Sequence, residues 1–458
     1  MHLVIIGNGI TGITAALTAR RLRPDARITI VSDETAHHFS RTALMYVYMG
    51  HLRYQDIKPY EDWFWPENRL ELVHATATGL DGQRKEVSLS AGPPLRYDQL
   101  LLATGSVSRL AAWPGQHLRG VQGLYSLPDL EQMARDTHGI RQAVVIGGGL
   151  IGVELAEMLH SRGISVTLLV RDDRYWGSVL PKPEAELIDR QLRAHHIEVR
   201  YCTELAELLP DAEGRVRAVR TTTGEELPAQ WVGLAIGVTP NLTLAQAAGL
   251  EADRGILVDE LLQTSVPSIF AAGDCAQHRQ PGAGEVAIEQ LWYTGRIQGE
   301  TVAHTLCGQP LPYRRGAWFN SAKFFDLEYQ TYGRVPAELT PGEESFYWQH
   351  YSARHALRIN FRPDANFAVT GMNAMGLRQR HDVWEDWLQA GTPVQTVLQE
   401  LGAANFDPEF FKQHEAAIVR QFNEQFPAQP VVLRRRKGLF GRLLASGRAA
   451  PVPSAPRR

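Results

Sequence analysis

The chain has 458 residues, of which 44% are hydrophobic and 21% are charged. That composition is ordinary for a soluble globular protein, and the length predicts about two to four domains. The net charge of −3 at pH 7 argues against a global nucleic-acid or membrane-surface role. No run of about 18 apolar residues is present, so the sequence predicts no membrane span.

Three cysteines, Cys202, Cys275 and Cys307, lie far apart in the sequence and form no CxxC pattern. This usage fits a reducing cytoplasm and does not match the usual iron–sulfur or zinc ligand patterns. Adjacent His37 and His38 are not spaced as a helical ligand pair, so we expect no metal site. Because the first residue leads directly into an apolar run, we also expect no signal peptide and a cytoplasmic location.

The chain opens with an apolar run, His2 to Ile6, followed at once by the turn Gly7-Asn8-Gly9-Ile10-Thr11-Gly12. An alanine-rich segment then predicts a helix to about Arg23, and Ile28 to Val31 predicts a second strand. Strand, glycine turn, helix and strand are the order of a dinucleotide-binding unit.

Each glycine of this turn has a separate task. Gly7 allows the tight turn, Gly9 lets the backbone approach a pyrophosphate, and Gly12 lets the helix pack close to the strand. The helix N-terminus then presents N–H groups to the phosphates. Asp33 or Glu34, after the second strand, is placed to accept hydrogen bonds from a ribose.

Further cofactor candidates follow in the first hundred residues. Arg41 can pair with a phosphate through its planar fork, although it can equally be a surface arginine. Residues Leu72 to Leu89 predict hairpin strands. Tyr97 to Ala103 predicts an apolar strand that ends at Thr104-Gly105.

A second unit of the same kind begins at Ala143. Val144 to Ile146 predicts a strand, and the turn that follows contains Gly147, Gly149 and Gly152. A helix with Glu154 then runs to about residue 162, and residues 165–170 predict the next strand. Two such units in one chain make nucleotide binding a strong prediction.

The second unit ends differently from the first. Its strand ends at Val170, and Arg171-Asp172-Asp173-Arg174 follows where a ribose-binding carboxylate is expected. Arginines would hold a 2′-phosphate, so this end favours NADP(H). The two aspartates leave NAD(H) open, because either can still reach a ribose, and both arginines can simply be solvated.

Residues 197–238 predict short strands, and the next strong signal is the strand that enters Gly273-Asp274-Cys275. A carboxylate at this position can accept hydrogen bonds from sugar or ribityl hydroxyls. Cys275 is most simply a small buried residue. Ile288 to Cys307 predicts a helix whose first turns contain three candidates, Glu289, Gln290 and Trp292.

From about Pro312 the character of the sequence changes. An aromatic segment, Trp318 to Phe325, precedes three predicted strands, at residues 346–351, 357–361 and 367–372. Two predicted helices, at residues 382–389 and 408–426, complete a separate α+β domain. The basic tail after residue 428 predicts disorder, with contact to a lipid surface or an acidic partner as the alternative.

These motifs together resemble the FAD/NAD(P)-dependent oxidoreductases with two dinucleotide-binding domains, the pyridine nucleotide-disulfide oxidoreductase superfamily. In that family the first unit binds FAD, Thr104-Gly105 resembles its ATG turn, and Gly273-Asp274 resembles its ribityl-binding Gly-Asp. Phe39-Ser40-Arg41 and Trp318-Phe319-Asn320-Ser321 resemble the branch of ferredoxin reductases and nitrite-reductase-like proteins.

The resemblance implies roles for several residues. A C-terminal aromatic, here Trp318, lies against the flavin, and Glu154 lies near the nicotinamide. Gln290 to Trp292 would begin a helix near the pyrimidine edge of the flavin. The strand end, Leu168 to Arg171, resembles that of NADP-dependent glutathione reductases.

Three departures from the family pattern matter. The disulfide reductases carry a cysteine pair beside the flavin, and this chain has none. Thr42 stands where the peroxide- and oxygen-reducing members carry a single redox cysteine. Tyr46 stands where the ferredoxin reductases place a lysine, so the branch assignment depends on the C-terminal segment.

We therefore expect an α/β fold with two Rossmann-like domains and a C-terminal α+β domain. The expected boundaries are 1–110 and 239–311 for FAD binding, 111–238 for NAD(P), 312–428 for the α+β domain, and 429–458 for the tail. The resemblance implies that hydride passes from NAD(P)H to FAD and that electrons leave to a separate acceptor such as a ferredoxin or rubredoxin. A membrane-surface quinone reductase and a flavin-bound redox sensor are the alternatives. The sequence also leaves a homodimer open.

Overall fold

The computed structural model describes residues 1–282, 284–406 and 410–434. The chain divides into two compact units. The first comprises residues 1–331 and 336–338, and the second comprises residues 332–335 and the chain from residue 339 onward. The predicted tail lies mostly outside the described residues, because only residues 429–434 of it are described. No helix in the described ranges is long and apolar enough to cross a membrane.

A parallel five-stranded sheet forms the first half of the first unit, in the order β19-β7-β1-β2-β3. Its strands are β1 (His2–Ile6), β2 (Arg27–Ser32), β3 (Leu70–His74), β7 (Gln99–Leu102) and β19 (Ile269–Ala271). The apolar side chains of β1 and β7 are fully buried, as expected for central parallel strands. The last strand comes from a segment about 170 positions after β7, so the second nucleotide unit is inserted between them.

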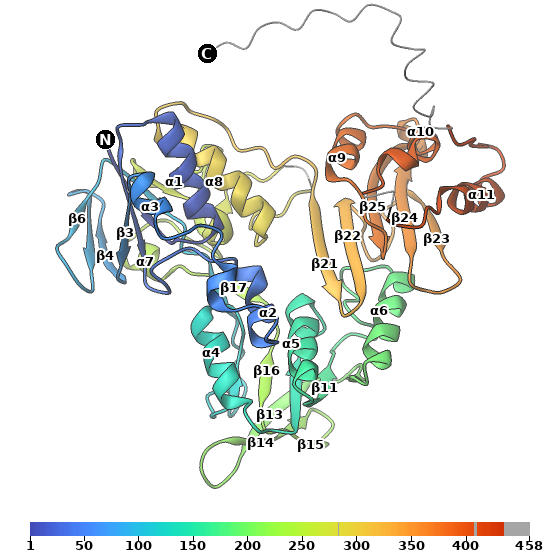
Figure 1. The fold of residues 1–458 in the computed structure, drawn as a ribbon, viewed down its shortest axis with the longest axis horizontal. Coiled ribbons are helices and arrows are strands. Elements are labelled where there is room, and N and C mark those ends of the chain that lie inside the picture. The colour runs from blue at the N-terminus through green and yellow to red at the C-terminus, as the bar shows by residue number, and fades with distance from the viewer. Residues whose placement is uncertain (283, 407–409, 435–458) are drawn as a thin grey trace, which may run out of the picture. The chain divides into compact units, whose positions relative to one another are not determined.

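Helices α1 (Ile10–Leu22) and α8 (Trp292–Leu306) pack side by side (Figure 1). Their close approach depends on two glycines of α8. A Cβ atom at Gly299 would lie 2.5 Å from the Thr11 carbonyl oxygen, and one at Gly295 would lie 2.8 Å from the Thr11 hydroxyl oxygen. The first and last parts of the nucleotide unit are therefore held together by small residues.

A second parallel sheet has the order β12-β11-β10-β16-β9. Its strands are β9 (Val121–Gln122), β10 (Gln142–Ile146), β11 (Ser165–Leu169), β12 (Glu198–Arg200) and β16 (Val232–Leu234). The helices of this half are α4 (Leu127–Asp136), α5 (Leu150–Ser161) and α6 (Lys182–Ala194). An antiparallel sheet of β13 (Leu205–Pro210), β14 (Val216–Thr221) and β15 (Glu226–Pro228) follows, so the predicted short strands of this region are confirmed.

Smaller elements connect these sheets. They are α2 (Leu44–Tyr48), α3 (Phe64–Glu67), β4 (Ala77–Asp81), β5 (Glu86–Leu89), β6 (Leu95–Arg96), β8 (Ser106–Ser108), β17 (Val238–Pro240), α7 (Thr243–Ala247), β18 (Ile256–Val258) and β20 (Ala276–His278). Strands β8 and β17 pair antiparallel and link the two halves of the unit.

Two predicted elements differ from the structure. The predicted hairpin at residues 72–89 is wrong in its first strand, because β3 pairs in parallel with β2 and the hairpin is formed by β4 and β5. The helix predicted from Ile288 begins only at Trp292, so Glu289 and Gln290 precede it. Leu291 is extended there, and the Glu289 side chain is held by tertiary partners rather than by the helix.

Strands β21 (Phe319–Phe324) and β22 (Leu327–Gly333) follow α8, and β21 lies wholly in the first unit. The second unit contains antiparallel β23 (Glu344–Gln349), β24 (Ala356–Arg362) and β25 (Ala368–Met375), with α9 (His381–Gln389), α10 (Val394–Gln399) and α11 (Glu415–Gln425). The three strands and α9 were predicted, whereas α10 was missed. The last helix begins at Glu415 and not near residue 408, because residues 410–414 are not helical and residues 407–409 are not described.

Candidate functional site

The two glycine turns have nearly the same backbone geometry. Gly7 has a φ of +113° and Gly147 a φ of +121°, values that L side chains rarely adopt. A Cβ atom at Gly12 would lie 2.0 Å from the Gly7 carbonyl oxygen, and one at Gly152 would lie 2.1 Å from the Gly147 carbonyl oxygen. Each helix therefore packs against its own turn more closely than any side chain allows.

The middle glycine of each turn has open space beside it. A Cβ atom at Gly9 or at Gly149 would meet no other heavy atom within 4 Å. Both residues are the N-caps of their helices, and neither helix has a side-chain cap for its first N–H groups. Free N–H groups at a helix start, with room for an approaching anion, fit the pyrophosphate of a dinucleotide.

The first nucleotide-binding motif, formed by β1, α1 and β2, is followed by an ion pair. The Arg41 guanidinium binds the Glu34 carboxylate in bidentate geometry, with N–O distances of 2.6 and 2.9 Å. Glu34 also accepts a hydrogen bond from the backbone N–H of Leu127, and Arg41 donates to the carbonyl of Tyr125. Burial lowers the pKa of Arg41, but Glu34 more than offsets this, so the pKa lies above its usual value. Asp33 is exposed.

A second carboxylate, Asp274, is reached by side chains from distant segments. It accepts hydrogen bonds from the hydroxyls of Ser106 (3.1 Å) and Tyr125 (3.3 Å). The Gln290 amide in turn donates to the Ser106 hydroxyl at 2.9 Å. Burial raises the pKa of Asp274 above its usual value. Gly273 has a φ of +79°, which turns the chain so that Asp274 points to these partners.

Thr104 and Gly105 join the start of this site to the segment after β17. The Thr104 hydroxyl donates to the carbonyl of Asn241 at 2.9 Å, and the Asn241 N–H donates to the carbonyl of Gly105. The structure therefore brings together Thr104, Gly105, Asp274 and Gln290 around one loop cluster. The Glu289 side chain bonds to none of these four residues, because its carboxylate is buried among Gln298, Tyr313 and Arg315.

The second nucleotide-binding motif, formed by β10, α5 and β11, is not followed by a comparable bidentate arginine–carboxylate pair. Val170 is buried, and Arg171 is exposed with Asp172 at 3.6 Å. Arg174 binds Asp173 (3.3 Å), Glu338 (3.2 Å) and the carbonyl of Gly177. The two arginines proposed for a 2′-phosphate therefore differ, because Arg174 already has three protein partners.

Glu154 lies in the second turn of α5, five residues after Gly149. Burial raises its pKa to about 7, and the neighbouring Glu157 adds to the increase. Glu157 itself binds Lys323 of β21 at 2.8 Å. The Tyr175 hydroxyl donates to the carbonyl of Gly149 at 2.6 Å and so stabilises the second glycine turn. A carboxyl group that can take or lose a proton near neutral pH therefore stands beside the second turn.

Comparison with known proteins identifies the family. Residues 1–293 match the model of the pyridine nucleotide-disulphide oxidoreductases, which is more than half of the chain. The chain belongs to the pyridine nucleotide-disulphide oxidoreductase family. It is therefore an oxidoreductase that uses FAD and NAD(P)H, as the family resemblance implied.

Several similar proteins are named as reductases of rhodocoxin, rubredoxin or ferredoxin. The chain is 32% identical to rhodocoxin reductase of Rhodococcus erythropolis, over 71% of this chain and 76% of the relative. It is 30% identical to rubredoxin-NAD(+) reductase of Ectopseudomonas oleovorans, over 68% of this chain and 81% of the relative. The crystal structure of the covalent putidaredoxin reductase–putidaredoxin complex matches with a TM-score of 0.74 and 25% identity, over 85% of this chain and 93% of that chain. The predicted family, branch and fold class are confirmed.

Trp318 lies in the first unit, just before β21. The Arg315 guanidinium lies over its ring, with 5.1 Å between the central carbon and the ring centre. Trp292 begins α8 and has the Arg296 guanidinium 5.9 Å from its ring centre. The family match ends at residue 293, so the role of Trp318 stays a prediction.

Sequence reasoning missed several side chains of the site. Ser106 and Tyr125 bind Asp274, and Tyr313, Gln298 and Arg315 bind Glu289. None of them belongs to a local motif, because each reaches its partner only through the tertiary fold. Ser106 was the nearest to a sequence signal, because it directly follows the predicted turn at Thr104-Gly105.

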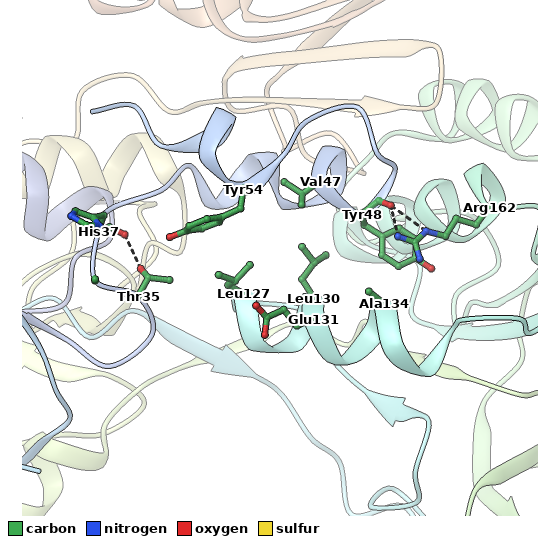
Figure 2. A pocket seen from close by; sticks show the side chains of 11 residues that line it. Thr35, His37, Val47, Tyr48, Tyr54, Leu127, Leu130, Glu131, Ala134 and Arg162 are labelled. Atoms are coloured by element: carbon green, nitrogen blue, oxygen red, sulfur yellow. Dashed lines mark hydrogen bonds between the residues drawn. The ribbon is translucent and has the colours of Figure 1, made fainter. Parts of the chain in front are cut away.

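A cavity of about 500 Å³ lies elsewhere in the first unit (Figure 2). It is lined by the loop after β2, by α2 and by α4, and its residues are Thr35, Ala36, His37, Val47, Tyr48, Tyr54, Leu127, Leu130, Glu131, Ala134 and Arg162. At one end the Arg162 guanidinium lies 3.6 Å from the centre of the Tyr48 ring and donates to the Tyr48 carbonyl. No glycine of either turn lines it, and no residue predicted for the site does so.

Proposed function

We propose that this chain is a reductase that takes electrons from NAD(P)H and delivers them, through FAD, to a separate small electron-transfer protein such as a ferredoxin or rubredoxin. One observation supports this above the others. A single chain contains two dinucleotide turns of matching geometry, while its three cysteines are all free and lie far apart, so no thiol pair is available as an internal acceptor. The names of the relatives, rhodocoxin reductase and rubredoxin-NAD(+) reductase, agree with an external acceptor.

In this proposal the first turn binds FAD. Gly9 and the start of α1 would hold the pyrophosphate, and Asp274 would accept hydrogen bonds from the ribityl hydroxyls. Gln290 would reach the flavin from the start of α8. Glu34 binds Arg41, so a ribose and Arg41 would share that carboxylate, or Arg41 would turn to a phosphate. When bound, FAD supplies the redox chemistry, because it accepts a hydride and can release its two electrons singly.

The second turn binds NAD(P)H in the same way, through Gly149 and the start of α5. Glu154, whose pKa burial raises to about 7, orients the nicotinamide and can hold a proton there at neutral pH. We propose NADPH as the preferred donor, because Val170 replaces the expected acid and Arg171 is exposed beside it. Trp318 borders the flavin on the side from which electrons leave.

We also propose that the FAD-binding and NAD(P)-binding domains meet at residues 110 and 238. The protein is proposed to be cytoplasmic. The basic tail is offered as a secondary contact with a lipid surface or an acidic partner.

Anaerobic stopped-flow mixing tests the proposed function. NAD(P)H should bleach the bound flavin within seconds, and a [2Fe–2S] ferredoxin or a rubredoxin should re-oxidise it faster than a short-chain quinone does. Slow reduction with a long-lived charge-transfer band would favour a sensor instead. Re-oxidation by quinone alone would contradict the protein acceptor.

Exchange of Trp318 for alanine tests the exit side within this proposal. If Trp318 borders the flavin, the variant should change the flavin spectrum and slow re-oxidation while reduction by NAD(P)H changes little. A destabilised variant with normal re-oxidation would mean that Trp318 is only a packing residue.

A further inference from the structure

The carboxylate of Glu289 is buried and has three protein partners, one from α8 and two from the segment that follows it. It accepts hydrogen bonds from the Tyr313 hydroxyl at 2.6 Å and from the Gln298 amide at 3.1 Å, and it pairs with the Arg315 guanidinium at 3.3 Å. The Tyr313 ring is itself stacked on His278, with 5.1 Å between the ring centres. A buried carboxylate costs several kcal/mol unless it is paired, so these contacts fix the position of Glu289 tightly.

Glu289 in turn fixes Arg315. The Arg315 side chain is mostly buried, and a second carboxylate, Glu285, lies 3.2 Å from its guanidinium. The guanidinium also lies 5.1 Å from the centre of the Trp318 ring. Its Nε–H is buried and finds no hydrogen-bond partner within the described part of the chain. The Arg315 guanidinium thus keeps its place over the Trp318 ring although its Nε–H donor is left without a hydrogen bond there.

The same network reaches the loop that contains Asp274. Gln298, whose amide nitrogen donates to Glu289, accepts a hydrogen bond from the backbone N–H of Gly273 at 2.7 Å through its amide oxygen. A continuous series of contacts therefore joins Gly273, Gln298, Glu289, Arg315 and Trp318. All five residues lie in the first unit.

We propose that Arg315 is a positioning residue for Trp318, and that Glu289 and Gln298 couple the Trp318 ring to the Gly273-Asp274 loop. Arg315 thereby sets how Trp318 stands at the exit side, without contacting a substrate itself. This inference rests on the proposed function, which places Trp318 beside the flavin. In this proposal Glu289 holds Arg315 in place beside Trp318. This role takes the place of the direct contact with the cofactor that the sequence suggested for Glu289.

Lysine and arginine separate this role from a simple ion pair. A lysine at position 315 can pair with Glu285 and Glu289 as a point charge, but it lacks the planar face that stacks on an indole ring. Arg315→Lys should therefore keep the fold while releasing the ring. Arg314, the exposed neighbour, provides the matched control in Arg314→Lys.

The first test uses the FAD-loaded protein. Arg315→Lys should shift the visible flavin spectrum and slow re-oxidation by a rubredoxin about threefold or more, the size expected for loss of a stacked cation. Reduction by NAD(P)H and the melting temperature should stay close to those of Arg314→Lys. A variant with unchanged spectrum and unchanged re-oxidation would overturn the proposal.

A double-mutant cycle with Trp318→Leu then tests whether the two residues act through each other. The double variant should be no slower in re-oxidation, and no more shifted in spectrum, than Trp318→Leu alone. Effects that multiply would show that Arg315 acts independently of Trp318 and would also overturn the proposal.

Two further measurements keep the test independent of turnover. In the FAD-free protein, Arg315→Lys should increase acrylamide quenching of tryptophan fluorescence, and this increase should disappear in the Trp318→Leu background. Glu289→Gln should act in the same direction as Arg315→Lys, and a folded Glu289→Gln variant with normal quenching would count against the coupling. If the unmodified protein reduces neither ferredoxin nor rubredoxin, the proposed function fails, whereas the spectral and quenching cycles still decide the role of Arg315.

Discussion

The two nucleotide units of this chain share a turn but differ at the end of their second strand. In both, the first glycine has a φ above +110°, the last glycine touches the carbonyl of the first, and the middle glycine faces open space. At the first end, Glu34 is locked to Arg41 and to the start of α4. At the second end, Arg171 is exposed and the preceding strand ends in a buried valine.

A second difference lies within helices α1 and α5. Glu154 of α5 stands five residues after Gly149, whereas the equivalent residue of α1, five residues after Gly9, is the uncharged Thr14. The lesson is that backbone geometry serves the part common to every dinucleotide, the pyrophosphate, whereas side chains decide which dinucleotide binds and what happens beside it.

The largest expected effect is at the first end. Glu34→Gln removes the charge partner of the partly buried Arg41, and breaking a buried pair costs about 3–5 kcal/mol. Because Arg41 keeps the Tyr125 carbonyl, we expect the lower limit of that range. Calorimetry should show a lower melting temperature and the purified protein should hold less FAD. Arg171→Ala, the matched change at the second end, should leave the melting temperature unchanged, and equal losses in both variants would remove the contrast between the ends.

The second prediction concerns Glu154 and pH. Its folded pKa of about 7 lies above the usual value of 4.5, so its charged form is disfavoured in the fold. Stability should therefore be full below about pH 4.5 and fall as the pH rises through about 7, by at most about 3 kcal/mol. Relative to Glu154→Gln, the melting temperature of the unmodified protein should decline over that window and then level off. Parallel curves for the two proteins would contradict the raised pKa.

The third prediction separates the roles of two glycines in one turn. Gly152→Ala places a Cβ atom 2.1 Å from the Gly147 carbonyl oxygen, and such overpacking costs about 1–3 kcal/mol. Gly149→Ala has room within the protein, so it should fold normally but weaken NAD(P)H binding in a fluorescence titration. The same contrast should appear for FAD with Gly12→Ala and Gly9→Ala. A stable Gly152→Ala variant would show that the helix can retreat from the turn.

The last prediction concerns the choice of nicotinamide nucleotide, which should leave the stability of the protein unchanged. An arginine that pairs with a 2′-phosphate contributes about 1.5–3 kcal/mol, which predicts a preference for NADPH of about tenfold or more. Arg171→Glu should remove most of it, as measured by kcat/KM with each nucleotide. Arg174→Ala should change it less, because Arg174 already binds Asp173, Glu338 and a carbonyl. Equal efficiency of the unmodified protein with both nucleotides would refute the preference.

The sequence by itself determined the parts of this protein that are local in the chain. Each glycine turn is six residues long, with a strand directly before it and a helix that begins within it, so spacing was enough to locate Gly7, Gly147 and their helices within one or two residues. The strand into Gly273-Asp274 was found in the same way. The family resemblance extended this to the cofactors, which the family match confirmed.

Only the tertiary structure decided what the polar side chains bind. Glu34 was correctly placed after its strand, but its partners, Arg41 and Leu127, come from two other segments. Glu289 was predicted within a helix beside the cofactor, whereas it precedes α8 and is buried with Tyr313 and Arg315. A backbone turn is set by its own residues' allowed dihedral angles, while the partner of a buried charge depends on how other segments of the chain, near or distant in sequence, fold against it.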